Sequence, residues 1–202
     1  MGNIDTTAKI AAGAILQRRE AMAASVRSLL VCVGEDVDRE GLRDTPARVA
    51  RMYEEVFSGL NEDPVLHLKT QFCDDGHEEI VVVRDIEFYS MCEHHLVPFF
   101  GKAHVAYVPQ GGRLTGLSKI ARCVQTIARR PQLQERLTSQ IVAALEEALT
   151  PLGAMALVEA EHLCMAMRGV RSSHSFTRTL VASGCLKTDP EQRAEAFQML
   201  KG

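Results

Sequence analysis

The hydrophobic and polar positions at the start of the chain predict two helices followed by a loop. Residues 4–33 are rich in Ala, Arg and Leu with helical spacing, and they predict one helix. The segment "RDTPARVARMYEEVFSG" opens with Thr45 and Pro46, a favourable helix start, and closes at Gly59. Residues 60–77 carry no such spacing, and we expect a loop there.

The rest of the chain changes between strand and helix patterns. We expect strands in four segments. The first two are rich in β-branched and aromatic residues, which favour strands. The four segments are residues 78–90, 102–109, 154–167 and 175–186. A helix with one apolar face is expected from Leu117, with Ser118 available as its cap. Another is expected from Pro131, with large apolar residues every four positions until Pro151, and a short terminal helix over residues 190–200.

This order of elements predicts an α+β fold. A helical arm is followed by two strands, two helices and two more strands, which is typical of an antiparallel sheet with helices on one face. We therefore expect a four-stranded antiparallel sheet backed by two helices. The predicted domains are a helical N-terminal extension over residues 1–60 and a main domain over residues 61–202.

Composition excludes some classes of function. The chain has 202 residues, of which 46% are hydrophobic, so it can bury one core. A net charge of −3 argues against a nucleic-acid-binding protein, because phosphate backbones require a basic surface. No apolar stretch approaches membrane-spanning length and no signal peptide is evident, so we expect no membrane partner and a cytoplasmic location. In that compartment the six cysteines are expected to be thiols or metal ligands rather than disulfides.

A thiol and imidazoles gather in two short segments. "MCEHHLVPF" contains Cys92, His94 and His95, and "HLC" contains His162 and Cys164. On a strand, side chains two apart share a face, so His162 and Cys164 would point the same way. Cys92, His95 and Cys164 would then give Zn²⁺ three protein ligands and leave a fourth position for water, as in catalytic zinc sites. His94 and His162 would remain as acid and base near neutral pH.

The spacing of these residues leaves two other interpretations open. One is a closed structural zinc site that takes one of the two remaining histidines as its fourth ligand. The other is a pair of buried thiols that bind nothing. Neither the C-x-x-H pair nor the H-x-C pair decides between them.

A basic segment suggests a binding site for a small polyanion. Ser118 at a helix N-terminus, with Lys119 and Arg122 one turn apart, offers amide donors and two cations for a triphosphate. Arg168 is a further candidate. A solvated helix face is the alternative interpretation.

Glu135 lies in the first turn of the following helix. An acid at that position complements the helix dipole, which contributes about 0.3–1 kcal/mol. The functional alternative is that its carboxylate accepts paired N–H donors from a guanine edge. Such a site rejects an analogue that lacks those donors by a factor on the order of 10⁴.

Five blocks occur in order along the chain and carry a family resemblance. They read "LRDTPARVARMYEEVFSGL", "SMCEHHLVPFFGKAHVAYVP", "GLSKIARCVQTIARR", "QLQERLTSQI" and "EAEHLCMAMRGV". With these blocks, the chain from about Val37 to Leu186 resembles the GTP cyclohydrolase I family. The resemblance implies a zinc-dependent enzyme that converts GTP to 7,8-dihydroneopterin triphosphate and formate, the first step of tetrahydrofolate and pterin biosynthesis.

The resemblance also implies a role for each candidate residue. The metal ligands are Cys92, His95 and Cys164. The catalytic residues are His94, His162 and Ser118, the last in a late rearrangement of the sugar. The guanine contacts are Gln134 and Glu135. The triphosphate contacts are Ser118, Lys119, Arg122, Arg168 and, from a neighbouring subunit, Arg48.

The family resemblance further implies a tunnelling fold and a ring-like homodecamer with active sites at subunit interfaces. Strands from adjacent subunits would then cover the edges of a small sheet. The sequence leaves two rival functions open. Another purine- or pterin-binding enzyme of the same fold would release no formate from GTP. A structural zinc protein that assembles into rings would unfold on Cys92→Ala, whereas a catalytic site would leave that variant folded and inactive.

Overall fold

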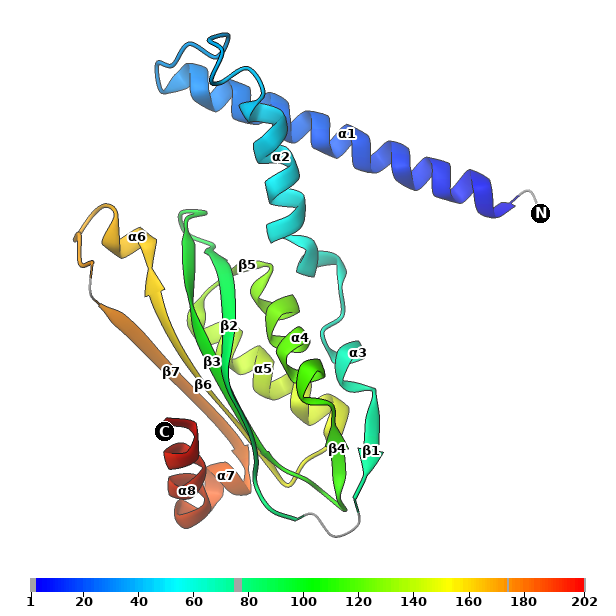
Figure 1. Cartoon of the computed structure of the whole chain (residues 1–202), viewed down its shortest axis with the longest axis vertical. Helices are drawn as coiled ribbons and strands as arrows, with labels where there is room; N and C mark the ends of the chain where they lie inside the picture. The colour runs from blue at the N-terminus through cyan, green and yellow to red at the C-terminus, as the bar shows by residue number, and fades with distance from the viewer. Residues whose placement is uncertain (1–2, 75–77, 174, 202) are drawn as a thin grey trace. The chain divides into compact units, whose positions relative to one another are not determined.

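The computed structural model describes residues 3–74, 78–173 and 175–201 (Figure 1). The chain divides into two compact units, residues 1–57 and residues 58–202. Across the described residues, no helix is both long and apolar enough to cross a membrane.

The first unit consists of two helices, α1 (Asn3–Cys32) and α2 (Thr45–Val56). Both were predicted, although α2 ends at Val56 instead of Gly59. A proline in the first turn of α2 favours its start, because the missing N–H has no partner to lose there. The Arg19 guanidinium joins the two helices by donating to both carboxylate oxygens of Glu54 at 2.7–3.0 Å.

The second unit is built on a mixed sheet with strand order β5-β2-β3-β6-β7. Its long strands run antiparallel to their neighbours and are β2 (Val81–Cys92), β3 (Pro98–Val108), β6 (Gly153–His162) and β7 (Phe176–Gly184). The fifth strand, β5 (Pro131–Gln132), pairs with β2 in parallel. The α+β class is therefore confirmed, but the sheet has five strands and not the four predicted.

The strand β5 also corrects the prediction that a helix begins at Pro131. Proline has no N–H to donate to a ladder, and it is tolerated at the edge of a sheet, where β5 lies. The next residues stay extended up to Leu133, and α5 (Gln134–Leu149) begins only at Gln134. Similarly, α4 (Leu117–Ala128) has Gly116 as its N-cap, so the predicted capping role of Ser118 is wrong.

Helices cover both faces of the sheet, which corrects the expectation of helices on one face. α4 and α5 lie along one face and bury the larger core (Figure 1). Fully buried members of this core include Phe88, Phe99, Tyr107, Ile127, Leu137 and Leu145. On the opposite face, α7 (Cys185–Thr188) and α8 (Pro190–Lys201) cover a smaller cluster. Leu186 and Leu200 contribute to it from these helices and are fully buried.

Residues 60–77 were predicted to be a loop, and this was wrong for part of the segment. After the short helix η1 (Ser58–Asn61), they contain α3 (Val65–Leu68) and β1 (Gln71–Cys73). β1 pairs with β4 (Arg113–Thr115) in a separate two-stranded sheet. Residues 75–77 lie outside the described residues.

Two features of β3 fix how its neighbours pair with it. A Cβ atom at Gly101 would lie 1.9 Å from the carbonyl oxygen of Glu159, so only glycine allows β3 and β6 to approach as they do. On the other side, β2 has an irregularity at Asp85, whose φ is 56° and whose backbone N–H donates to Nδ1 of buried His104 at 3.2 Å. The resulting register places Phe99 of β3 opposite His162 of β6.

Candidate functional site

The first two candidate metal ligands lie where β2 turns into β3. Cys92 is the last residue of β2, and the turn is closed by the Leu96 N–H, which donates to the Cys92 carbonyl at 2.8 Å. The Cys92 N–H donates in turn to the Val97 carbonyl at 2.9 Å. Leu96 adopts a φ of 50°, a conformation that costs energy for a residue with a side chain. This tight turn carries His95 back toward Cys92.

The third candidate ligand, Cys164, does not lie on a strand as predicted. β6 ends at His162, and Cys164 belongs to the short helix α6 (Leu163–Ala166). The strand argument for His162 and Cys164 was therefore wrong. Cys164 nevertheless meets the other two ligands, because the β3–β6 register brings the end of β6 beside the turn.

The donor atoms of Cys92, His95 and Cys164 all lie within 4.8 Å of one another. Two thiolates and an imidazole are the donor types that zinc prefers, at bond lengths of ~2.0–2.3 Å. Ligands around one tetrahedral zinc are then ~3.3–3.8 Å apart. The three side chains therefore fit Zn²⁺ after a small inward movement.

Burial and the neighbouring Cys92 raise the pKa of the Cys164 thiol. Without a cation beside it, Cys164 therefore favours the protonated thiol over the nucleophilic thiolate. A metal ion bound there would displace that proton, because cysteine binds zinc as the thiolate.

His162 lies beside this group with both its orientation and its tautomer fixed. Its ring stacks on Phe99 with centroids 4.7 Å apart and planes 1° from parallel. Its Nε2 lies 2.7 Å from Oε1 of Gln134, the first residue of α5. Burial lowers the pKa of His162, which favours the neutral ring, while the charge of nearby Glu135 opposes this effect.

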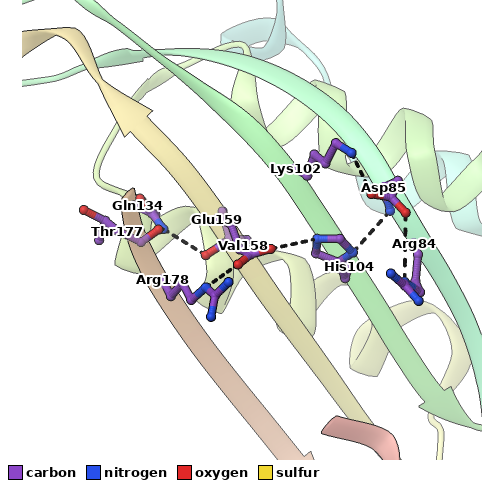
Figure 2. Close-up of polar contacts among 9 residues, drawn as sticks. All are labelled: Arg84, Asp85, Lys102, His104, Gln134, Val158, Glu159, Thr177 and Arg178. Atoms are coloured by element: carbon purple, nitrogen blue, oxygen red, sulfur yellow. Dashed lines mark hydrogen bonds and ion pairs between the residues drawn. The ribbon is translucent and has the colours of Figure 1, made fainter. Parts of the chain in front are cut away.

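The surroundings of Gln134 decide which nitrogen of His162 carries the proton. Gln134 is buried, and its amide nitrogen donates to the carbonyls of Val158 at 3.0 Å and Thr177 at 2.9 Å (Figure 2). The hydroxyl of Thr179 is a third acceptor, at 3.2 Å. Because acceptors surround the nitrogen, the amide oxygen faces His162, whose Nε2–H must be the donor. Nδ1 of His162 is therefore the atom that can accept a proton.

Three more candidates lie on elements that meet at this end of the sheet. Glu135 follows Gln134 and is exposed, and His94 is exposed beside His95 with ring centroids 6.3 Å apart. Nη1 of Arg168 lies 3.3 Å from Nε2 of His95. Besides the candidate ligand His95, the structure thus brings one carboxylate, two imidazoles and one guanidinium to the end of the sheet that holds the metal group. They belong to Glu135, His94, His162 and Arg168.

The basic segment of α4 lies at the opposite end of the sheet. The residue before its N-cap, Thr115, contacts the Tyr107 hydroxyl through its backbone N–H at 3.4 Å. Tyr107 and Phe99 are separated by eight positions of β3, or about 26 Å at the usual rise. Ser118 and Lys119, in the first turn of α4, are therefore distant from the metal group of the same chain.

Arg122 lies one turn further along α4 and is exposed. Arg48 belongs to α2 of the first unit, where it is exposed and donates to Asp44 at 3.3 Å. Within the second unit, the structure thus does not gather Ser118 and Lys119 around the metal group.

Comparisons with known proteins identify the family. The model of the family described as GTP cyclohydrolase I matches residues 22–201. The chain belongs to the GTP cyclohydrolase I family. It is 58% identical over 183 residues to GTP cyclohydrolase 1 of Bacillus pumilus, covering 91% of this chain and 96% of the relative. It is 57% identical to GTP cyclohydrolase 1 of Clostridioides difficile, covering 90% and 96% of the two chains.

The family match extends beyond the segment that the sequence blocks indicated, to both ends of the second unit and into α1. It thus includes the candidate metal ligands and the residues around them. Relatives in this family carry the name of an enzyme that acts on GTP.

Sequence reasoning missed several residues that shape the site of this GTP cyclohydrolase I family member. Phe99 stacks on His162, and Thr179 contacts both Gln134 and the hydroxyl of Thr138, at 2.6 Å. Each of these contacts joins distant parts of the chain. No local motif marks them, so only the strand register could have indicated them.

The opposite face of the sheet holds an open groove of about 710 Å³. Its charges are largely paired, because Arg178 forms an ion pair with Glu159 and Lys102 donates to Asp85 at 2.8 Å (Figure 2). The ring of His104 lies between these pairs, with Nε2 3.5 Å from Glu159. The metal-ligand group contributes no residue to this groove.

Proposed function

We propose that the chain catalyses the zinc-dependent conversion of GTP to 7,8-dihydroneopterin triphosphate and formate. The observation that carries this proposal is the convergence of Cys92, His95 and Cys164 beside His162, at the start of the helix that bears Glu135. Membership of the GTP cyclohydrolase I family and the names of its relatives support the choice of GTP as substrate.

Cys92, His95 and Cys164 would hold Zn²⁺. When bound there, zinc supplies Lewis-acid chemistry, which in hydrolases lowers the pKa of a water ligand toward neutrality. The protein orients the donors through the β2–β3 turn and α6. The overall reaction consumes one water and removes carbon 8 of the purine as formate.

We assign the proton transfer at the imidazole ring of GTP to His162. The Gln134 amide holds Nε2–H, so the mobile proton is carried on Nδ1. Protonated His162 would donate to nitrogen 7 and make carbon 8 more electrophilic, and the neutral ring would take the proton back. A lowered pKa favours return to the neutral base at working pH. His94, exposed in the adjoining turn, is proposed to assist opening of the ribose.

We assign guanine recognition to Glu135 and a supporting role to Gln134. Among the described residues, the Glu135 carboxylate makes no hydrogen bond or ion pair, so it is available to accept two N–H donors from guanine. The Gln134 side chain is already committed to His162 and two backbone carbonyls. We therefore propose that Gln134 acts mainly through His162.

The triphosphate contacts are proposed to come from two chains. Arg168, which follows α6, lies on the same chain as the metal group and approaches His95. Ser118 and Lys119 lie in the first turn of α4, near the end of β3 that is remote from the metal group, so we propose that they serve the site of a neighbouring subunit, together with Arg122 one turn further along the same helix. Arg48 is assigned to the phosphates by the family resemblance, and Ser118 is assigned to the late sugar rearrangement on the same ground.

This division of the site requires a homo-oligomer. The edge strand β7 supports one, because it has a single neighbour in the sheet and exposes Phe176 at 69%. We propose the tunnelling fold for residues 61–202 as the catalytic domain, with residues 1–60 as a helical extension. The homodecamer and the cytoplasmic location stay predictions. Light scattering coupled to size-exclusion chromatography tests the first.

The experiment that tests the function is incubation of the purified chain with GTP. We expect formate and a fluorescent pterin, after oxidation, in equal amounts, and no product in the presence of a chelator. Turnover of GTP without formate would favour another enzyme of this fold. Unfolding of Cys92→Ala, measured by circular dichroism, would favour a structural metal site.

A further inference from the structure

An ion pair joins the metal-ligand turn to the helix that begins with Gln134. Glu93 lies between the candidate ligands of that turn, and Arg136 lies in the first turn of α5. The guanidinium holds both carboxylate oxygens, Nη1 contacting Oε2 and Nη2 donating to Oε1 at 3.1 Å. Such two-point contacts fix the relative orientation of the groups as well as their distance.

A backbone contact anchors the same turn at one further point. The Glu93 N–H donates to the Gln132 carbonyl at 3.0 Å, next to the β2–β5 pairing. The Gln132 side chain is fixed by donating to the Ile127 carbonyl at 3.0 Å and to Gln140 at 2.8 Å. The backbone hydrogen bond holds the turn next to β5, and the two-point ion pair adds a side-chain link from the turn to the first turn of α5.

We infer that Glu93 and Arg136 are positioning residues, which set the metal-ligand turn at a fixed distance and orientation from the guanine-binding start of α5. This inference rests on the proposed function. Neither residue contacts a reacting atom. Both side chains are partly exposed, at 29% and 44%, so the pair contributes little to folding stability. Its effect is expected in the alignment of carbon 8 with the metal group.

The test compares four forms of the full chain. Arg136→Gln removes the pair, and the double variant Glu93→Arg with Arg136→Glu restores it in reverse. The control is Arg39→Gln, which removes a two-point pair with Glu35 of similar exposure in the first unit. For each form, kcat, KM for GTP and bound zinc are measured. In cobalt-substituted protein, the change of the visible spectrum on adding GTP is also recorded.

We expect Arg136→Gln to lower kcat by about ten- to a hundredfold, because misalignment of about 1 Å costs that much. KM and zinc content should stay within about threefold of the parent, since each half of the site keeps its own groups. The cobalt spectrum should no longer respond to GTP. The reversed pair should recover both kcat and the spectral response, and the control should match the parent.

The inference is overturned if Arg136→Gln keeps the parental kcat, or if zinc content falls in step with kcat. It is also overturned if the reversed pair recovers neither signal. Absence of formate from the parent chain would instead overturn the proposed function. The two failures are therefore distinguishable.

Discussion

Gln134 offers the sharpest test of how the fold prepares His162. The change Gln134→Met keeps a similar volume but removes every hydrogen bond of the side chain. The amide nitrogen loses its contacts with Val158, Thr177 and Thr179, and the amide oxygen no longer accepts the His162 Nε2–H at 2.7 Å. Methionine offers none of these groups a hydrogen-bond partner, although Thr179 keeps its contact with the Thr138 hydroxyl at 2.6 Å.

The expected magnitude follows from the contacts. The amide nitrogen has two hydrogens for its three acceptors, so two donated hydrogen bonds and one accepted hydrogen bond are lost. Each contributes roughly 0.5–1.5 kcal/mol, so the free energy of unfolding should fall by about 2–4 kcal/mol. For a chain of this size the melting temperature should fall by about 5–15 °C. The His162 ring would also be free to take its other tautomer. Since a positioned acid or base contributes on the order of 10²–10⁴ in rate, kcat should fall by at least about tenfold.

The assay is thermal unfolding by circular dichroism combined with formate release at a temperature where the variant is folded. Gln140→Met is the matched control, because Gln140 lies on the same helix and accepts a single hydrogen bond, from Gln132 at 2.8 Å. It should change kcat by less than about twofold. Parental kcat in folded Gln134→Met would refute the positioning of His162.

A second variant, Gln134→Glu, tests whether the surroundings of this side chain favour a protonated carboxyl group over a carboxylate. One carboxylate oxygen would face the carbonyls of Val158 and Thr177, so the folded state would favour the protonated acid and raise its pKa. The unfolded chain loses that proton near pH 4.3. Stability should therefore decrease as the pH rises above this value, and the melting temperature should be lower at pH 8 than at pH 5. Equal destabilisation at both values would contradict the predicted hydrogen-bond directions.

Three further predictions concern stability and reactivity. Gly101→Ala should destabilise the fold by about 3 kcal/mol or more, because its Cβ would lie 1.9 Å from the Glu159 oxygen; urea unfolding within 1 kcal/mol of the parent would contradict this. Burial lowers the pKa of His104, so the unfolded chain binds the proton first and stability should fall as the pH drops below about 6.5. His104→Gln should flatten that dependence in thermal melts between pH 7.5 and 5.5, and an unchanged slope would exclude His104 as its source. Burial raises the pKa of Cys123 to about 12, so iodoacetamide at pH 8 should label exposed Cys32 and spare Cys123, as peptide mass spectrometry would show. Labelling of both in the folded chain would contradict this.

Regular elements with strong local patterns were predicted well. The first helix was predicted over residues 4–33 and spans Asn3–Cys32, and the terminal helix was predicted over residues 190–200 and spans Pro190–Lys201. Long periodic segments carry their own signal. The strand β5 carries none, because two residues are too few for any period, and its pairing with β2 comes only from the tertiary fold.

The metal group was predicted for a reason that was correct in part. Cys92 and His95 lie in the same turn of the chain, so their short spacing in the sequence is enough to predict that they meet. The same-face argument for Cys164 failed, since β6 ends at His162. What brings Cys164 in is the alignment of β6 with β3, which a short motif does not encode.

The contacts around the site could not be predicted from local sequence. His162 and Gln134 are 28 positions apart, and Arg136 and Glu93 are 43 positions apart. Each pair depends on where α5 lies against the sheet. The separation of Ser118 from the metal group depends on the same packing, because α4 begins at the other end of β3.

The central claim is that Cys92, His95 and Cys164 hold one metal ion that is required for hydrolysis of GTP. Its most direct test is a titration of zinc into metal-stripped protein while formate release is measured. The account predicts that the rate rises in proportion to zinc and saturates at about one ion per chain. It also predicts that folded Cys164→Ala gives no saturable rise. Formate release that is independent of zinc, or parental activity in Cys164→Ala, would contradict the account.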